Sequence, residues 1–560
     1  MTSKYALGTS LLLASSCALI DPIDVSPTAH GAASSAGFGS TMAGAMNGSS
    51  GSGVAGTASN AGGSSGKTSD EVPCVVNADC ESKSRCLPTG VCASLITDTT
   101  GPCPKLIGGE FASDPNAIFF GAFAPLDQDS VEAQTISAIY EMAAEEFNAL
   151  GGLRGASGGR PSPLVVTVCN NSEASTPQAL SHLINDVQVP ALLAAMDANQ
   201  LLAGFNAYPD TFFVSAFNGS RELADVSGGR LWTMLGRPAD YADIYAALMP
   251  HVEESVHADL IQNGNDRKLR VATVIEVESA FELELSRAVL SRITVNGSSL
   301  ADQPSNYLGT QVATDGSNVV QVVQSLYEFS PDIVFSFAGN LFTAGHGVMN
   351  RLDQEYWPDQ RPFYVLSPEN AQAGADVSAE LTRLRKADKD NVHRVLGVAS
   401  AGLPPGMTDA LNAFKLNLLA KYPDARTDFG NYYDAFYYLV DAMYASPRQA
   451  FRDGTLSAGD LARGMRRLTN LSKAKIDVGP NGISDMFSTL NSSDSETQLY
   501  GTMGAPDFDR TTGMRRESGS VFCFDSPRLN IQNDVIAYHR DTDRLQQVEH
   551  PPCLVGFLSP

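Results

Sequence analysis

The chain has 560 residues and a formal net charge of −24, from 62 acidic and 38 basic residues. This surplus of negative charge argues against binding to nucleic acid or to an anionic membrane face, since both are themselves negatively charged. Hydrophobic residues make up 43% of the chain and charged residues 18%, a globular and not a disordered composition. The length exceeds the roughly 100 to 200 residues of one ordinary domain, so two large lobes with small appendages are expected.

The first residues have the features of an export signal, predicted over residues 1–16. The segment MTSKYALGTSLLLASSCALI carries one Lys4, a short apolar run and small residues before Cys17. Cleavage before Cys17 fits ordinary signal processing and also a bacterial lipobox, in which the new N-terminal cysteine accepts a lipid. No later segment has the roughly 18 to 20 continuous apolar residues of a membrane span. We therefore expect a periplasmic or cell-surface protein that meets the membrane only through a lipid on Cys17, with simple secretion as the alternative.

Residues 17–73 are predicted to form a flexible Gly/Ser/Ala-rich tether. From Gly31 to Gly66 the sequence is almost wholly Gly, Ala, Ser, Thr and Asn, without charge. Such a composition cannot bury enough apolar area to offset the entropy lost on ordering. A Gly/Ser coil of about 50 residues has a root-mean-square reach of roughly 35 to 40 Å, enough to hold a folded domain clear of a membrane.

Cysteine use agrees with export, because eight cysteines remain after Cys17 and an even number fits an oxidising compartment. They are Cys74, Cys80, Cys86, Cys92, Cys103, Cys169, Cys523 and Cys553. The first four recur every six residues, without the C-x2-C pairs or nearby histidine of structural zinc sites, so no metal is expected. We expect a small disulfide-rich module over residues 74–103. Spacing does not fix the pairing there; for the remaining cysteines we predict Cys103 with Cys169 and Cys523 with Cys553.

Beyond residue 113, strand-like and helix-like segments alternate, which is typical of parallel sheets covered by helices on both faces. The intervening segments place apolar residues three and four apart, as in Leu411, Phe414 and Leu418, and these predict helix faces in the core. The strand-like runs are Ile118–Ala124, Leu164–Cys169, Val189–Ala195, Phe212–Phe217, Val271–Val277, Ile333–Phe337, Phe363–Leu366 and Val395–Val398. The expected fold class is α/β.

Four motifs occur in an order that resembles the type I periplasmic binding proteins, specifically the leucine/isoleucine/valine-binding branch. They are FAPLD followed by ALGGLRG, then RVATVIEVESAFELELSRAV, then FYVLSPENA, and finally YGTMGAPDFDRTTGMR. The resemblance covers about residues 116–515. It implies two Rossmann-like lobes with parallel sheets, joined by a three-segment hinge and closing over a ligand held between them.

The resemblance also implies lobe boundaries. Lobe one would comprise residues 116–236 and 399–504, and lobe two residues 237–398 and 505–560. The chain would cross between the lobes near Gly236, Ala399 and Ala505, which are the hinge candidates.

In lobe one, amino-acid-binding members of that family hold the α-carboxylate through small hydroxyl residues on two loops. The matching positions here are Asp197, Ala198 and Asn199 in one loop and Phe217 and Asn218 in the other. The expected hydroxyls are displaced or missing. An ionised Asp197 would repel a carboxylate by about a few kcal/mol at about 4 Å, even with an effective dielectric constant of roughly 20. A cationic or amine-bearing ligand is therefore favoured over a plain carboxylate.

In lobe two the resemblance places Glu369 where the family uses a carboxylate for the ligand's ammonium group. Phe281 matches an aromatic position beside the ligand, and Asn340 matches a strand-end position that reaches it. Each has a structural alternative: a solvated loop glutamate, a core aromatic and a helix N-cap, respectively.

Enzymatic activity is not expected. The segment from Gly155 to Gly159 matches G-x-S-x-G, but it follows a helix and precedes a strand, whereas a nucleophile elbow needs the order strand, turn, helix. The eight histidines are scattered without an H-E-x-x-H motif, and no cofactor is indicated.

The sequence thus predicts a monomeric exported solute-binding protein for a small polar, amine-bearing or amino-acid-like ligand, with an ABC permease as its partner in uptake. One alternative is a surface-tethered ligand sensor without transport, and another is a secreted hydrolase.

Overall fold

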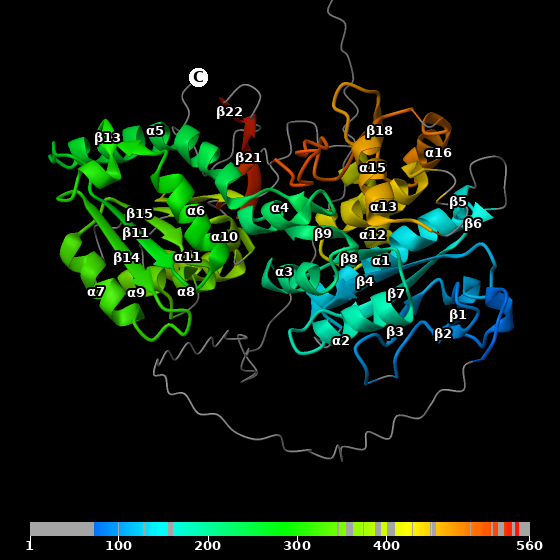
Figure 1. Ribbon diagram of the computed structural model, residues 1–560. Coiled ribbons are helices and arrows are strands. Elements are labelled where there is room, and N and C mark those ends of the chain that lie inside the picture. The colour runs from blue at the N-terminus through cyan, green and yellow to red at the C-terminus, as the bar shows by residue number, and fades with distance from the viewer. Residues whose placement is uncertain are drawn as a thin grey trace, which may run out of the picture. The chain divides into compact units, whose positions relative to one another are not determined.

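The computed structural model describes residues 72–547 (Figure 1). Within that range it leaves out 99, 127–129, 155–160, 197, 344–345, 354–361, 373, 387–393, 400–408, 428, 448–449, 451–454, 493, 517–518, 525–530 and 540–543. The predicted signal, the tether, Cys17 and Cys553 lie outside the described residues. Among the described residues, no helix has the length and apolar character needed to cross a bilayer.

The first sheet has six strands in the order β10-β9-β8-β4-β7-β3. They are β3 (Lys105–Ile107), β4 (Ile118–Ala124), β7 (Leu164–Asn170), β8 (Ala191–Ala194), β9 (Phe212–Asn218) and β10 (Leu231–Leu235). All neighbours pair in parallel except β3, which is antiparallel to β7. The strands of the parallel part are buried almost throughout, as expected for a sheet covered on both faces.

The core around this sheet takes residues from two stretches of the chain, from Leu95 to Met234 and from Ala410 to Met514. Leu411, Phe414 and Leu418 are all buried, which confirms the predicted helix stripe. The helices are α1 (Val131–Ala149), α2 (Thr176–Ser181), η3 (His182–Asp186), α3 (Ala198–Ala207), α4 (Arg221–Ser227), α12 (Asp409–Lys421), α13 (Gly430–Ala445), α15 (Ala458–Leu468) and α16 (Pro480–Thr489).

The second sheet has eight strands in the order β14-β11-β15-β16-β17-β20-β21-β22. They are β11 (Val271–Glu276), β14 (Tyr307–Val312), β15 (Ile333–Phe337), β16 (Phe363–Leu366), β17 (Val395–Ala399), β20 (Ser520–Phe524), β21 (Ile531–His539) and β22 (Arg544–Gln547). The first five pair in parallel, and the last three extend the sheet by antiparallel pairing.

Helices cover both faces of the second sheet, because adjacent strand residues such as Val271 and Ala272 belong to two different apolar cores. The helices are α5 (Pro238–Gln262), α6 (Ala280–Leu290), α7 (Val319–Phe329), α8 (Gly339–Thr343), α9 (Val348–Arg351), α10 (Pro368–Gln372) and α11 (Gly374–Lys386). The predicted α/β class with parallel sheets is confirmed.

The parallel parts of the two sheets share one strand order. In each sheet the first parallel strand of the chain, β4 or β11, lies in the interior of the sheet. The second strand, β7 or β14, pairs with one side of it, and the third, fourth and fifth strands follow in order on the other side. The direction of winding therefore reverses between β4 and β8 in the first sheet, and between β11 and β15 in the second. In open α/β sheets, ligands bind outside the carboxyl ends of the strands at such a reversal.

Small elements complete the described chain. They are η1 (Asn77–Asp79), β1 (Ser84–Cys86), β2 (Cys92–Ser94), η2 (Gly109–Phe111), β5 (Leu153–Arg154), β6 (Pro161–Ser162), β12 (Thr294–Val295), β13 (Ser298–Ser299), η4 (Leu300–Asp302), β18 (Lys475–Asp477) and β19 (Gln498–Tyr500).

The cysteine-rich module is held by two overlapping disulfides, Cys74–Cys86 and Cys80–Cys92. The sulfur atoms of Cys74, Cys80 and Cys92 lie within 4.8 Å of one another. Each of them is in a disulfide, so none offers a thiolate to a metal ion. Asn77 of the module donates from Nδ2 to the carbonyl of Asp114 at 2.8 Å, which attaches the module to the segment before β4.

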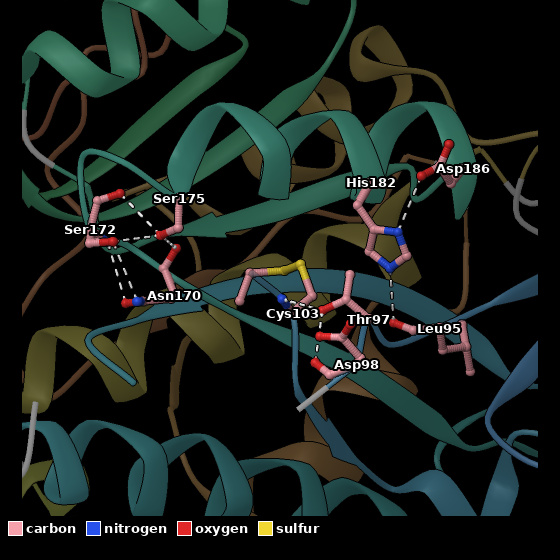
Figure 2. The surroundings of a disulfide bond; sticks show 10 residues. Leu95, Thr97, Asp98, Cys103, Asn170, Ser172, Ser175, His182 and Asp186 are labelled. Atoms are coloured by element: carbon pink, nitrogen blue, oxygen red, sulfur yellow. Dashed lines mark hydrogen bonds and ion pairs between the residues drawn. A yellow bond between two sulfur atoms is a disulfide. The ribbon is translucent and has the colours of Figure 1, made fainter. Parts of the chain in front are cut away.

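The third disulfide joins Cys103, just before β3, to Cys169 in β7, the pairing predicted for the N-terminal bridge (Figure 2). Both cysteines are fully buried. The backbone N–H of Cys103 donates to Thr97 Oγ1 at 2.9 Å, and His182 Nε2 lies 3.4 Å from the carbonyl oxygen of Leu95. The segment leading into β3 is thus fixed to the first sheet. Cys523 is also disulfide-bonded, and its predicted partner Cys553 lies outside the described residues.

Candidate functional site

Three glutamates gather at the carboxyl ends of neighbouring parallel strands of the second sheet. Glu276 is the last residue of β11, and Glu282 lies in the first turn of α6, the helix that follows β11. Glu369 lies in α10, which begins two residues after β16 ends. Gly339, the first residue of α8, follows β15 between them. The reversal of winding between β11 and β15 therefore brings acidic side chains together where this fold class binds ligands.

Glu282 is held in place by hydrogen bonds to one of its two carboxyl oxygens. Its Oε1 accepts from Ser367 Oγ at 2.5 Å and from the backbone N–H of Gly339 at 3.3 Å. The other oxygen, Oε2, is buried and receives no hydrogen bond from an N–H group or a hydroxyl group of the described residues. The side chain as a whole has no exposed surface. Glu282 is thus a sealed carboxyl with one unsatisfied oxygen, an arrangement that costs free energy unless a proton or a cation compensates it.

Glu282 takes its position from a helix cap. Ser279 is the N-cap of α6, and its hydroxyl accepts from the backbone N–H of Glu282 at 3.2 Å. The first turn of α6 then points its glutamate toward the loops that follow β15 and β16. Unpaired N–H groups at a helix start favour a negative charge, which is why an acidic residue is common there.

Glu369 packs directly over Gly339. A β-carbon built at position 339 would lie 2.9 Å from Glu369 Oε2, and Gly339 has a φ of +38°. The turn carrying Glu369 is fixed by Asn370, whose Nδ2 donates to the Gly339 carbonyl at 2.5 Å and whose Oδ1 accepts from the Ser367 N–H at 3.1 Å. Ser367 and Asn370 are fully buried, whereas Glu369 is only half-buried. Glu369 thus keeps some exposed surface, whereas Glu282 has none.

The two carboxyls act on each other. Burial raises the pKa of Glu282 well above its ordinary value, and the nearby charge of Glu369 raises it further. Burial also raises the pKa of Glu369, as does the charge of Glu276, while a hydrogen bond with Glu282 opposes the rise. Burial is likewise the main reason that the pKa of Glu276 is raised. Because burial and mutual repulsion act on both groups, the two carboxyls titrate as a coupled pair and not independently.

No basic side chain neutralises this cluster from within the part of the chain that the structure describes. None of Glu276, Glu282 and Glu369 forms an ion pair there with a lysine, arginine or histidine. Tyr245 of α5 is close, but its hydroxyl donates to the Leu366 carbonyl at 3.1 Å, and burial keeps its pKa far above the ordinary value. The cluster can therefore hold protons or accept a positively charged group.

The other residues predicted for lobe two lie at the starts of the helices that follow β11 and β15. Phe281 is in the first turn of α6, is half-buried, and packs edge-on against Tyr241 with ring centroids 6.2 Å apart. Asn340 is the second residue of α8. The helices that follow β11, β15 and β16 thus begin with the turns that carry Phe281, Asn340 and Glu369.

The residues predicted for lobe one follow β8 and end β9. Asp197 lies outside the described residues; Ala198 begins α3, and Asn199 is an exposed residue of that helix. Phe217 and Asn218 are the last two residues of β9, and the Phe217 ring packs edge-on against Tyr432 at 5.7 Å.

Glu282 was not among the predicted site residues. In the sequence it stands in ELELSRAV and is indistinguishable from an acidic residue that caps a helix. Its partner Ser367 is 85 residues away along the chain. The strand order would have pointed to Glu282. Because β11 and β15 are neighbours in the sheet, the start of α6, which follows β11, lies beside the segment that follows β15.

Solved structures with a similar fold include ligand-binding proteins of transporters. A leucine-binding protein from Thermotoga maritima matches with a TM-score of 0.50 and 12% identity, over 76% of this chain and 100% of that one. A substrate-binding protein from Desulfitobacterium hafniense in complex with leucine has a TM-score of 0.47 and 12% identity, over 74% and 100% of the two chains. A branched-chain amino acid binding protein from Streptococcus pneumoniae in complex with isoleucine has a TM-score of 0.47 and 11% identity, over 74% and 99%.

No family model and no curated protein matches the sequence. The structural likeness nevertheless defines the fold, which is that of the type I periplasmic binding proteins. Within that class the chain resembles the leucine/isoleucine/valine-binding branch, as the order of its motifs predicted.

Proposed function

We propose that the chain is an exported solute-binding protein that captures a small polar ligand bearing an amino group and delivers it to an ABC-type permease. The observation that carries this proposal is Glu369, a half-buried residue at the carboxyl ends of the second sheet whose carboxyl has no basic partner among the described residues. A carboxylate that lacks an internal counter-ion forms charge-assisted hydrogen bonds with an ammonium group. The fold supports the same conclusion, since ligands of open α/β sheets bind at this edge.

The remaining contacts are proposed from the loops that match the family. Phe281 and Asn340 would contact the ligand from the second sheet. From the first sheet the proposed contacts are Asp197, Ala198, Asn199, Phe217 and Asn218. We further propose that the protein works as a monomer held to the membrane by a lipid on Cys17.

A thermal-shift screen of the purified protein tests the binding function. Amino acids, polyamines, amides, sugars and short peptides are the probes. Ligand at about 100 times its dissociation constant adds about 2.7 kcal/mol, which raises the melting temperature by a few degrees. We expect a hit among amines or amino acids that Glu369→Gln abolishes. Glu254→Gln, an exposed position on α5, is the matched control. A complete absence of shifts across the library would contradict the proposal.

A tethered sensor without transport is the second candidate. It is favoured by the double-disulfide module that follows the Gly/Ser-rich residues 17–73 and is attached to the segment before β4 by Asn77. Uptake of the radiolabelled hit by cells with and without the protein separates the two candidates. Uptake that depends on the protein supports transport, whereas ligand binding without any change in uptake supports the sensor.

A further inference from the structure

Glu282 and Glu369 differ in what can reach them. Glu282 is sealed, and Ser367 and Gly339 fix its Oε1 while its Oε2 has no donor among the described residues. Glu369 is half-buried and keeps some exposed surface. One carboxyl of the pair is thus sealed inside the protein, and the other belongs to a residue that is partly exposed.

Among the described residues, the elements packed around the pair bring no positive side chain into an ion pair with either carboxyl. Helix α5 supplies the neutral phenol of Tyr245, which donates its hydrogen bond to the Leu366 carbonyl and not to either carboxyl. The end of β11 supplies Glu276, another acidic residue. The negative charge of Glu278 raises the pKa of Glu276. The loop after β16 supplies Ser367 and Asn370, which are neutral.

From the segment after β15, the described contact with Glu282 is the hydrogen bond that the N–H of Gly339 donates. Two adjacent ionised carboxyls would thus face each other and a third negative group in a largely dry site. This arrangement is strongly unfavourable without a proton or a cation.

We propose that Glu282 and Glu369 share one proton while the site is empty, and that an alkylammonium group binding at Glu369 displaces this proton to solvent. This inference rests on the proposed function. The charges balance: the empty pair carries one proton and one negative charge, and the occupied pair carries two negative charges and one ammonium. Ligand capture is then coupled to proton release, and affinity decreases as the pH falls.

The direction of this pH dependence follows from the pair itself. Burial raises the pKa of Glu282 well above its ordinary value, so the shared proton persists at a pH where other carboxyls are ionised. Below the pH at which the empty pair loses its proton, each ligand releases one proton, and affinity falls about tenfold for each pH unit. Above that pH the affinity is constant.

The first test needs no ligand. Carbon NMR of protein labelled at glutamate carboxyls follows each titration with pH. We expect one carboxyl that titrates well above the ordinary glutamate range and is absent from Glu282→Gln. The amide suits this purpose because its oxygen accepts from Ser367 and its nitrogen donates to Glu369, as the protonated acid does. Ordinary titration of all glutamates would overturn the proposal. If Glu282→Gln does not fold, Glu369→Gln at the half-buried position serves instead, and the raised titration should then move toward the ordinary range, because Glu282 loses its charged neighbour.

The second test uses two ammonium probes, putrescine and L-leucine, which distinguish a bare amine from an amino acid. Titration calorimetry in buffers of different ionisation enthalpy counts the protons released on binding. We expect about one proton per ligand in the native protein below the titration point of the pair, none in Glu282→Gln, and an unchanged count in Glu254→Gln. Binding of either probe without proton release would overturn the inference but leave the proposed function intact.

Two further outcomes separate a failure of the proton-displacement inference from a failure of the solute-binding function. If neither probe moves the raised carboxyl titration, displacement of the proton by an ammonium group is wrong. If in addition no compound of the screen binds at a pH above that titration, where the pair is fully ionised, the solute-binding function is wrong as well.

Discussion

Gly339 sets the position of Glu369, because the Glu369 carboxylate occupies the space in which a side chain at position 339 would begin. A β-carbon there would lie 2.9 Å from Glu369 Oε2. The backbone of Gly339 also donates to Glu282 through its N–H and accepts from Asn370 through its carbonyl. One glycine thus connects the two acidic residues and the turn that carries one of them.

Replacing Gly339 with alanine is expected to displace Glu369 and to weaken binding of any amine ligand at least tenfold. The unfolding free energy should fall by about 1 kcal/mol or more, since a left-handed φ of +38° is unfavourable for alanine. Gly264→Ala is the matched control: its φ is +76°, but nothing lies within 4 Å of the added carbon. Denaturant unfolding and calorimetric binding separate the two effects. Equal losses of binding in both variants would contradict the role of Gly339.

Glu282→Gln should change how stability depends on pH. The folded protein holds a proton on Glu282 at a pH where the unfolded chain, with a pKa near 4.5, has lost it. The wild-type unfolding free energy therefore falls as the pH rises above 4.5, by up to about 1.4 kcal/mol per unit, until the folded pKa is passed. The variant lacks this decline. Urea unfolding at a series of pH values measures it, and parallel curves for the two proteins would show that Glu282 is not protonated.

Replacement by asparagine is expected to have opposite effects on stability at two aspartates of helix α13, Asp441 and Asp434. Asp441 is buried, its Oδ1 has no hydrogen-bond partner among the described residues, and burial raises its pKa well above the ordinary value. The wild-type protein should therefore lose stability as the pH rises above about 4, the ordinary aspartate pKa. Asp441→Asn should remove this loss and be at least as stable as the wild type at neutral pH.

Asp434→Asn is the opposite case. The Asp434 carboxylate accepts from the backbone N–H of Thr502 at 2.8 Å and of Met503 at 2.9 Å. An amide would turn its NH2 group against one of these donors, at a cost of about 1 to 3 kcal/mol. Denaturant unfolding at neutral pH compares the two variants, and destabilisation of the same size in both would contradict the assignment.

Removing the Cys103–Cys169 disulfide should destabilise the part of the protein built on the first sheet. The bond spans 66 residues, and closing a loop of that length in the unfolded chain is worth about 4 kcal/mol in the chain-entropy model. We expect the double alanine variant to lose about 2 to 4 kcal/mol in guanidinium unfolding. The Cys74–Cys86 bond closes a loop of only 12 residues, so its removal should cost less. A larger effect for the shorter loop would contradict this account.

The sequence predicted the sheets well because buried parallel strands are continuous apolar runs. Ile118–Ala124, Ile333–Phe337 and Phe363–Leu366 were each predicted with the bounds that the structure has. Glu369 was a predicted residue because it stands in a recognisable motif directly after a strand. These features depend on residues that are close together in the chain.

Other features depend on contacts between distant residues, which spacing alone does not fix. Four cysteines at equal intervals allow three pairings, and only the folded module selects Cys74–Cys86 with Cys80–Cys92. The same limit applies to Glu282, whose role depends on Ser367 and Glu369 in a loop that follows a different strand.

The overlap of the two bonds in the cysteine-rich module gives it resistance to a nick in the backbone. Hydrolysis between Cys74 and Cys80 leaves both ends joined through Cys74–Cys86, and hydrolysis between Cys86 and Cys92 leaves them joined through Cys80–Cys92. A break between Cys80 and Cys86 is spanned by both bonds. No single cut by a protease within residues 74–92 can therefore release the globular part of the protein from a segment attached before Cys74.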